Sequence, residues 1–350
     1  MTKGRKLHLD LLRIIAIFLV VYNHTGINGC SYYYAIHDSL WHFPLMVLAY
    51  VMRCAVPVFF MISGALLLKK NEAIKTLYRK RVLRFLIVLV VASLISYLYK
   101  IRQDFAQFSL IYFLNQLYSY NLCYSYWFLY QYLAWLICLP FLRRMAQNMK
   151  NEDFLYLFAI VAVVNLMTFA PLAVLGEPTS YSKNFAPFVL NNTVFYPLAG
   201  YYLEERVPES EYCNKNTLIL FLLFVVSAGI TVVAQNYWCE NYLHWELGGA
   251  EGYLSTLGFV PAILLYYMSK LLFIRFTAPK VFQKLISLLG SCSLGVYLFQ
   301  HIYLEMTSDL WLRTAFGTWL GTVLWVVEVC LIGTAVTIIL KQIPGVKKLL

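Results

Sequence analysis

The stretch LDLLRIIAIFLVVYNH, residues 9–24, opens an apolar run to residue 27 that is long enough to cross a lipid bilayer as one helix. Its ionisable residues are Asp10, Arg13 and His24. Arg13 and His24 are eleven residues apart, so on a helix they share a face to within about 20° and lie roughly 16 Å apart along the axis. Because ionisable side chains are costly inside a bilayer, both residues are candidates for function.

The composition of the whole chain is typical of a membrane protein. Of the 350 residues, 61% are hydrophobic and 13% are charged, whereas a soluble domain has about 45–50% and about 25%. Apolar runs of membrane length lie near residues 9–27, 41–67, 82–99, 124–142, 154–175, 186–203, 217–235, 253–274, 285–304 and 315–340. The sequence therefore predicts an all-α fold, a single polytopic transmembrane helix bundle of about ten spans over residues 1–350, without an attached soluble domain.

The basic residues predict how this bundle is oriented. Cytoplasmic loops of membrane proteins collect Lys and Arg. If the N-terminus is inside, alternate loops carry 22 of the 28 Lys and Arg residues. This distribution predicts that both termini are cytoplasmic. On the opposite side, residues 105–118 are expected to form an interfacial helix.

Several classes of function are disfavoured. The formal net charge of +11 follows from the inner loops, and no soluble region carries a basic stripe, so we expect no nucleic-acid partner. The eight cysteines form no C-x-x-C pair and no cluster with histidine, so no metal site is expected. The chain also lacks a P-loop and a dinucleotide-binding glycine motif. Tyrosine and tryptophan on the outer segments favour either an interfacial belt or a stacking surface for sugars.

Arg13 and His24 each have two interpretations. Arg13 either holds an anion with its permanent charge, or extends to the inner surface and pairs with Asp10 one turn away. His24 either moves a proton near neutral pH, or is a hydrogen-bonded packing residue.

Two further pairs of ionisable residues are predicted inside or near the bilayer. Arg53 in the second span and Glu328 in the tenth lie at similar depth, which favours an ion pair, although each can instead pair with other polar groups. His301 and Glu305, four residues apart near the outer end of the ninth span, are either interfacial or a catalytic pair that ranks behind His24.

A basic cluster enters the third span. Arg79, Lys80, Arg81 and Arg84 are explained either by the topology of the inner loops or by a phosphate site. Arg81 and Arg84 are three residues apart and therefore neighbours on one helical face. Two guanidinium groups placed in this way suit the phosphates of a nucleotide-like donor.

These residues carry a resemblance to a known family. Residues 9–24 resemble the first helix of the acyltransferase family 3 membrane proteins, which have an Arg and a His separated by ten residues. VPVFFMISGALLL (residues 56–68) resembles the second helix of that family, and Arg81 and Arg84 match its R-x-x-R motif. YWFLYQYLAWLICLPFLRR (126–144) and CSLGVYLFQHIYL (292–304) are similar to its later W-F-L and G-x-Y-L segments. The resemblance covers nearly the whole chain.

Resemblance to this family implies an integral membrane O-acyltransferase in the plasma membrane, on the whole a bacterial one. It implies that an acyl group, commonly acetyl, moves from cytosolic acyl-CoA to a hydroxyl of an extracytoplasmic glycan or cell-surface polymer. Arg81 and Arg84, with Arg79 and Lys80, would hold the CoA phosphates, and Arg13 would guide the donor inward. His24 would act as general base or carry the acyl group itself.

Two other classes stay open at this stage. A transporter or flippase of a glycolipid or small solute would also need many helices and intramembrane charge, although the two halves of this chain do not resemble each other. A non-catalytic component of a polysaccharide export complex would tolerate the loss of His24. Since some relatives finish the transfer with a soluble domain that is not expected here, the chain is expected to act directly or with a partner protein.

Overall fold

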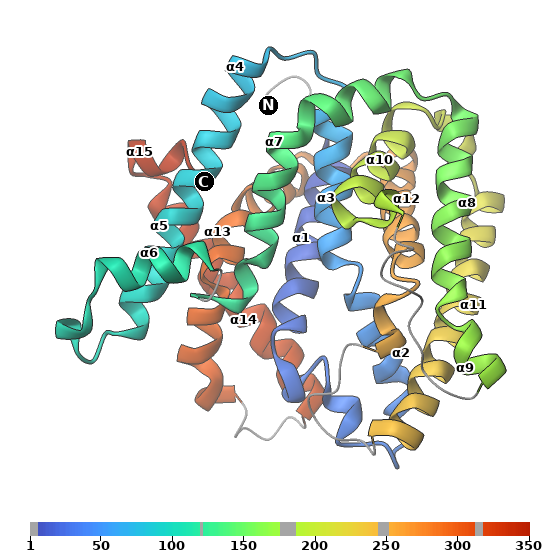
Figure 1. Cartoon of the computed structure of the whole chain (residues 1–350), viewed down its shortest axis with the longest axis horizontal. Helices are drawn as coiled ribbons and strands as arrows, with labels where there is room; N and C mark the ends of the chain where they lie inside the picture. The colour runs from blue at the N-terminus through green and yellow to red at the C-terminus, as the bar shows by residue number, and fades with distance from the viewer. Residues whose placement is uncertain (1–5, 120–121, 176–186, 244–251, 312–317) are drawn as a thin grey trace.

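The computed structural model describes residues 6–119, 122–175, 187–243, 252–311 and 318–350, and within them all regular structure is helical (Figure 1). The α-helices are α1 (Leu7–Asn23), α2 (His42–Met52), α3 (Ala55–Leu67), α4 (Ile74–Leu77), α5 (Leu83–Lys100), α6 (Leu110–Tyr118), α7 (Trp127–Asn148), α8 (Asn151–Met167), α9 (Ala170–Leu175), α10 (Asn192–Glu205), α11 (Asn214–Trp238), α12 (Phe259–Arg275), α13 (Lys280–Trp311), α14 (Thr318–Leu340) and α15 (Pro344–Lys347).

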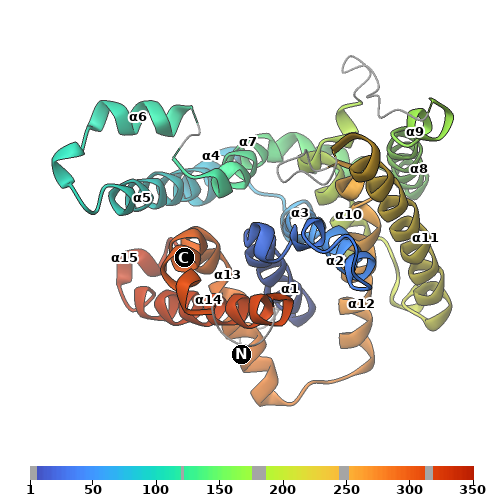
Figure 2. The ribbon, with the colours of Figure 1, turned by 90° about the horizontal axis from the view of Figure 1, so that it is seen from below.

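Helix α1 lies at the centre of the bundle. It packs against α3 and α12 on one side and against α13 and α14 on the other, as Figure 2 shows. Leu12, Ala16 and Val21 on α1 are fully buried. A helix that is apolar on nearly all sides is expected in such a buried position, and it holds the Arg13 side chain inside the protein rather than against lipid.

Helices α3 and α10 make the closest contact in the bundle. A Cβ added to Gly64 would overlap the backbone of Pro197, and one added to Gly200 would overlap the backbone of Met61. Small residues allow the backbones of membrane helices to approach in this way. This contact fixes the position of α3, which forms one wall of the cavity described below.

The span predicted over residues 41–67 is divided in two. Helix α2 ends at Met52 and α3 begins at Ala55, so Arg53 lies at the break. Pro57 in the first turn of α3 explains the break, because a proline ring clashes with the carbonyl four residues earlier and has no N–H to donate. The apolar run over residues 41–67 had predicted one continuous helix here, because apolar content alone does not show the effect of this proline.

Seven helical segments of the described chain are long and apolar enough to cross a membrane. Helices α1, α10 and α12 lie at three further predicted spans but have only 17, 14 and 17 residues. A multi-pass helical membrane protein is therefore confirmed, and the number of about ten spans stays a prediction. The helix expected over residues 105–118 is a 3-10 turn followed by α6, which lies beside α5 at the edge of the bundle.

The described ends of the chain lie at the same end of the bundle. Lys6 Nζ contacts Glu204 Oε1 at 2.5 Å, at the last turn of α10. Leu349 contacts Arg84 at the start of α5. This end of the bundle carries the basic loops that the sequence assigns to the cytoplasm. The side of the membrane on which it lies stays a prediction.

Candidate active site

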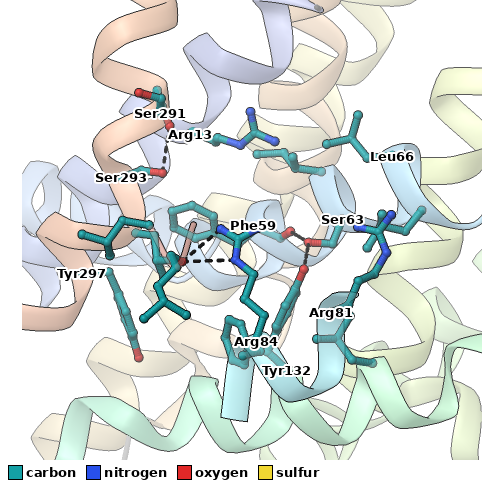
Figure 3. A pocket seen from close by; sticks show the side chains of 18 of the residues that line it. Arg13, Phe59, Ser63, Leu66, Arg81, Arg84, Tyr132, Ser291, Ser293 and Tyr297 are labelled. Atoms are coloured by element: carbon teal, nitrogen blue, oxygen red, sulfur yellow. Dashed lines mark hydrogen bonds between the residues drawn. The ribbon is translucent and has the colours of Figure 1, made fainter. Parts of the chain in front are cut away.

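A cavity of about 440 Å³ opens at this basic end of the bundle. Residues from α1, α3, α5, α7 and α13 line it, together with the π-helical turn Tyr78–Val82, Lys341 directly after α14 and the segment after α15. Figure 3 shows the side chains of Arg13, Arg81 and Arg84 gathered around it. The volume falls within the range of small-molecule sites, about 300–1,000 Å³.

The lining is strongly cationic. Among the described lining residues there is no Asp or Glu side chain, whereas five are cationic: Arg13, Lys80, Arg81, Arg84 and Lys341. Fixed positive charge in a partly enclosed site attracts and orients phosphate groups. Four of these residues were predicted from the sequence, and the cavity brings them together.

The predicted cluster does not enter the cavity as a whole. Arg79 is exposed and is absent from the lining. The π-helical turn Tyr78–Val82 sets this division. Single π-helical turns are frequent at functional sites because they shift the direction of side chains within a helix.

Arg13 is oriented by a buried carboxylate. Its Nη1 donates to Asp10 Oδ1 at 2.5 Å, one turn earlier on α1, and Asp10 is fully buried. The backbone and Cβ of Asp10 pack against Gly290 of α13, which also lines the cavity. The predicted pair with Asp10 is thus formed, and Arg13 also lines the cavity, where its binding of an anion stays a prediction.

Arg84 is engaged by the end of the described chain. Its Nε and Nη2 both donate to the carbonyl oxygen of Leu349, at 3.2 and 3.0 Å. Leu349 and Leu350 also line the cavity. A phosphate that binds Arg84 through the same two donors has to displace this carbonyl.

Aromatic side chains also line the cavity. They are Phe59, Phe128, Tyr132 and Tyr297, and the Phe128 and Tyr297 rings meet edge to face with centroids 5.5 Å apart. The Tyr132 hydroxyl receives a 3.4 Å hydrogen bond from Ser63 (Figure 3). The lining therefore combines cationic with aromatic side chains, which suits a ligand that carries both phosphates and an uncharged arm.

His24 lies beyond the lining residues of the cavity. It is the half-buried residue at the C-terminal end of α1, and its backbone N–H donates to Val20 and Val21. Among the described residues its side chain has no hydrogen-bond partner. It is close enough to Arg53 and His301 to interact with both electrostatically.

His301 lies between the cavity and His24. It follows Tyr297, a lining residue, by one turn of α13, and its ring stands edge-on to Tyr126 with centroids 5.6 Å apart. Both ring nitrogens are buried and have no hydrogen-bond partner among the described residues. The two histidines thus lie near each other, and His301 is one turn from the lining residue Tyr297.

Comparison with known proteins identifies the family. The model of the acyltransferase 3 family, described as an acyltransferase domain, matches residues 7–341. The chain belongs to the acyltransferase 3 family. No curated protein and no solved structure gives a significant match. Membership makes this chain a membrane acyltransferase, as its sequence predicted, and the matched region contains Arg13, His24, Arg81 and Arg84.

The ion pair predicted between Arg53 and Glu328 is not formed in this acyltransferase. Glu328 Oε2 is buried without a partner among the described residues. The prediction rested on equal depth, which says nothing about direction around the helix axis. Helix α14 packs against α13 and α1, whereas Arg53 is near His24 at the end of α1. Glu305 pairs with Arg102 at 2.9 Å and also interacts electrostatically with His301, so a catalytic role for His301 and Glu305 stays a prediction.

Some residues that line the cavity of this acyltransferase were not predicted from the sequence as site residues. Lys341 was counted only among the inner basic residues, yet it lines the cavity and its Nζ donates to the Ser291 carbonyl at 2.6 Å. Tyr132 gave no sequence signal that separates it from the many other tyrosines. No group of three His, Cys, Asp or Glu side chains that could hold a metal ion occurs among the residues the structure describes.

Proposed function

We propose that this membrane acyltransferase is an O-acetyltransferase. It takes an acetyl group from cytosolic acetyl-CoA and transfers it to a hydroxyl of an extracytoplasmic glycan at the cell surface, across a bacterial plasma membrane. The observation that carries this proposal is the cavity with five cationic lining residues at the basic end of the bundle, whose lining residue Tyr297 lies one turn before His301, the neighbour of His24.

The chemical character of acetyl-CoA suits the lining of the cavity. CoA carries its phosphates far from its thiol, joined by an uncharged arm. Arg81, Arg84 and Lys341 would hold the phosphates through charge-assisted hydrogen bonds. The arm would then pass Arg13 and lie along Phe59, Phe128 and Tyr132. This path would bring the thioester towards Tyr297 and the neighbouring His301.

The chemistry would take place at His24. As a general base, His24 takes the proton of the acceptor hydroxyl while the oxygen attacks the thioester carbonyl. The C–S bond then breaks, and the CoA thiolate leaves and takes up a proton. In the alternative, a ring nitrogen of His24 first accepts the acetyl group and then passes it to the hydroxyl. His301 lies near enough to His24 for the two side chains to interact electrostatically.

The test combines the donor and the product. Purified protein in lipid nanodiscs should consume acetyl-CoA and release free CoA thiol when a glycan acceptor is present. Mass spectrometry should also detect fewer acetyl groups on the surface glycans of cells without the gene. Loss of glycan acetylation without any thioester consumption by the purified protein would contradict the proposal and favour a transporter.

A further inference from the structure

Glu72 connects the cavity to a buried arginine. It lies in the loop between α3 and α4, and its Oε2 accepts from Arg81 Nε at 3.0 Å. The same oxygen accepts from Arg143 Nη2 of α7, also at 3.0 Å. Arg143 is 5% exposed, and its Nε donates to the carbonyl of Leu67 at the end of α3 at 2.9 Å. The Glu72 Oε2 atom thus accepts from two guanidinium groups. Through Arg143 it also links the loop after α3 to α7.

The hydrogen bond to Glu72 leaves the two Nη groups of Arg81 available to a ligand in the cavity. A guanidinium group has donors on three sides, and Glu72 uses only the Nε side. The two Nη groups have no partner among the described residues, and Arg81 lines the cavity. Two parallel Nη donors held in a fixed plane are the arrangement that binds a phosphate through two hydrogen bonds.

Arg81, Glu72 and Arg143 together carry a net positive charge beside the cavity. Arg81 and Glu72 alone would be neutral, so a lone carboxylate would cancel the attraction of Arg81 for an anion. Because Arg143 shares the same carboxylate, the three residues together keep one positive charge. Burial alone would raise the pKa of Glu72, but the bonds from Arg143 and Arg81 outweigh this and lower it. The carboxylate therefore remains ionised near neutral pH.

We propose that Glu72, braced by Arg143, is a positioning residue that presents the two Nη groups of Arg81 to a phosphate of the acyl donor. This inference rests on the proposed function. Glu72 does not itself touch the donor. Its effect is expected on donor affinity and not on the chemical step.

The experiment measures binding of CoA, which does not react, and the KM and kcat for acetyl-CoA. The variants are Glu72→Gln, Arg81→Gln and the double variant, and Glu205→Gln is the matched control. Glu205 is another inner carboxylate, bonded to Lys69 at 2.8 Å, and it does not line the cavity. Glu72→Gln keeps an acceptor oxygen and removes only the charge, so it is expected to fold, which a melting curve checks.

We expect Glu72→Gln to weaken CoA binding by about three- to tenfold, the usual size of coupling between neighbouring residues, and to leave kcat within about twofold. In the Arg81→Gln background the same change should have no further effect, because Arg81 transmits it. Glu205→Gln should leave CoA binding unchanged. Arg143→Lys, which keeps the charge but loses the fork that holds Glu72, should weaken CoA binding in the same direction.

Other outcomes would overturn the inference. Unchanged or tighter CoA binding in Glu72→Gln would mean that Glu72 only neutralises Arg143 or competes with the donor. A loss of affinity that persists in the Arg81→Gln background would mean that Glu72 acts elsewhere. If Arg81→Gln itself leaves CoA binding unchanged, the donor site of the proposed function fails as well, which separates the two failures.

Discussion

At the scale of single residues, Arg81 and Arg84 differ from their neighbour Arg79 only in where the helix directs them. Arg81 and Arg84 line the cavity, whereas Arg79 does not. Each charge-assisted contact to a phosphate contributes about 1.5–3 kcal/mol, so replacing both Arg81 and Arg84 with Gln should raise the KM for acetyl-CoA by on the order of a hundredfold or more. Steady-state kinetics over a range of acetyl-CoA concentrations measures this.

Arg79→Gln is the control for that measurement, since it removes one positive charge from the same basic cluster without changing the lining of the cavity. It should change the KM by less than about twofold, because an exposed charge outside the site contributes little after screening. Equal effects of the Arg79 variant and the double variant would show that the cluster acts only through general charge or topology.

At the scale of helices, a buried network joins α1, α10 and α12 beside the cavity. Glu204 accepts from Lys6 at 2.5 Å and from Tyr266 at 2.7 Å, and lies 3.0 Å from His8 Nε2. Burial raises the pKa of Glu204, but these bonds outweigh it and bring the pKa to about 2. A depressed carboxylate pKa stabilises the fold above the unfolded value of about 4.3, and the stabilisation is lost as the pH falls through about 2.

Glu204→Gln should therefore lower the free energy of unfolding at pH 7 by on the order of 3 kcal/mol, because it leaves partly buried cations without their counter-ion. The difference in melting temperature between wild type and variant should shrink as the pH is lowered from 5 towards 2. The exposed neighbour serves as control, and Glu205→Gln should stay within about 0.5 kcal/mol. A pH-independent difference would contradict the assigned role of the Glu204 charge.

The contact between α3 and α10 gives a second prediction at this scale. Gly200→Ala should destabilise the protein by about 1–3 kcal/mol or more, since its Cβ would overlap the backbone of Met61. Gly229→Ala on α11 is the matched control, because nothing lies within 4 Å of the added Cβ, and it should be neutral or stabilise by up to about 1 kcal/mol. Thermal unfolding in detergent compares them. Equal melting temperatures would mean that the two helices can separate without cost.

At the scale of the whole molecule, the basic end of the bundle is predicted to face the cytoplasm. A cysteine introduced at the exposed position Ile27 should react with a membrane-impermeant maleimide in intact cells, and one introduced at Lys75 should react only after permeabilisation. The unsubstituted protein measures the background from its own cysteines. Labelling of the Lys75 position in intact cells would place the cavity on the outer side, away from cytosolic acyl-CoA.

Much of this arrangement could be predicted from the sequence, because its signals are local. The length of the apolar runs predicted the helix bundle. Arg13 and His24 were predicted as functional residues because ionisable side chains are costly in an apolar run. The three-residue spacing gave the shared direction of Arg81 and Arg84. These properties depend on helix geometry alone.

The remaining features depend on how helices are turned against each other. Depth suggested a pair between Arg53 and Glu328, but their directions around the helix axes do not bring them together. Glu72 is a loop residue whose role appears only when Arg143 of α7 is placed beside it. Lys341 was counted only as an inner basic residue. Its place in the cavity depends on how the end of α14 packs against α13, which the sequence does not show.

The central claim is that His24 carries out acyl transfer from a donor held in the cationic cavity. The most direct measurement is turnover of acetyl-CoA by the His24→Gln and His24→Ala variants, with CoA affinity and melting temperature measured on the same samples. Both variants should bind CoA and melt as the wild type does, while turnover falls by about 10²–10⁴-fold, the contribution of a positioned base. Close to full turnover in His24→Gln would contradict the account, because glutamine can hydrogen-bond in place of histidine but cannot take up and return a proton.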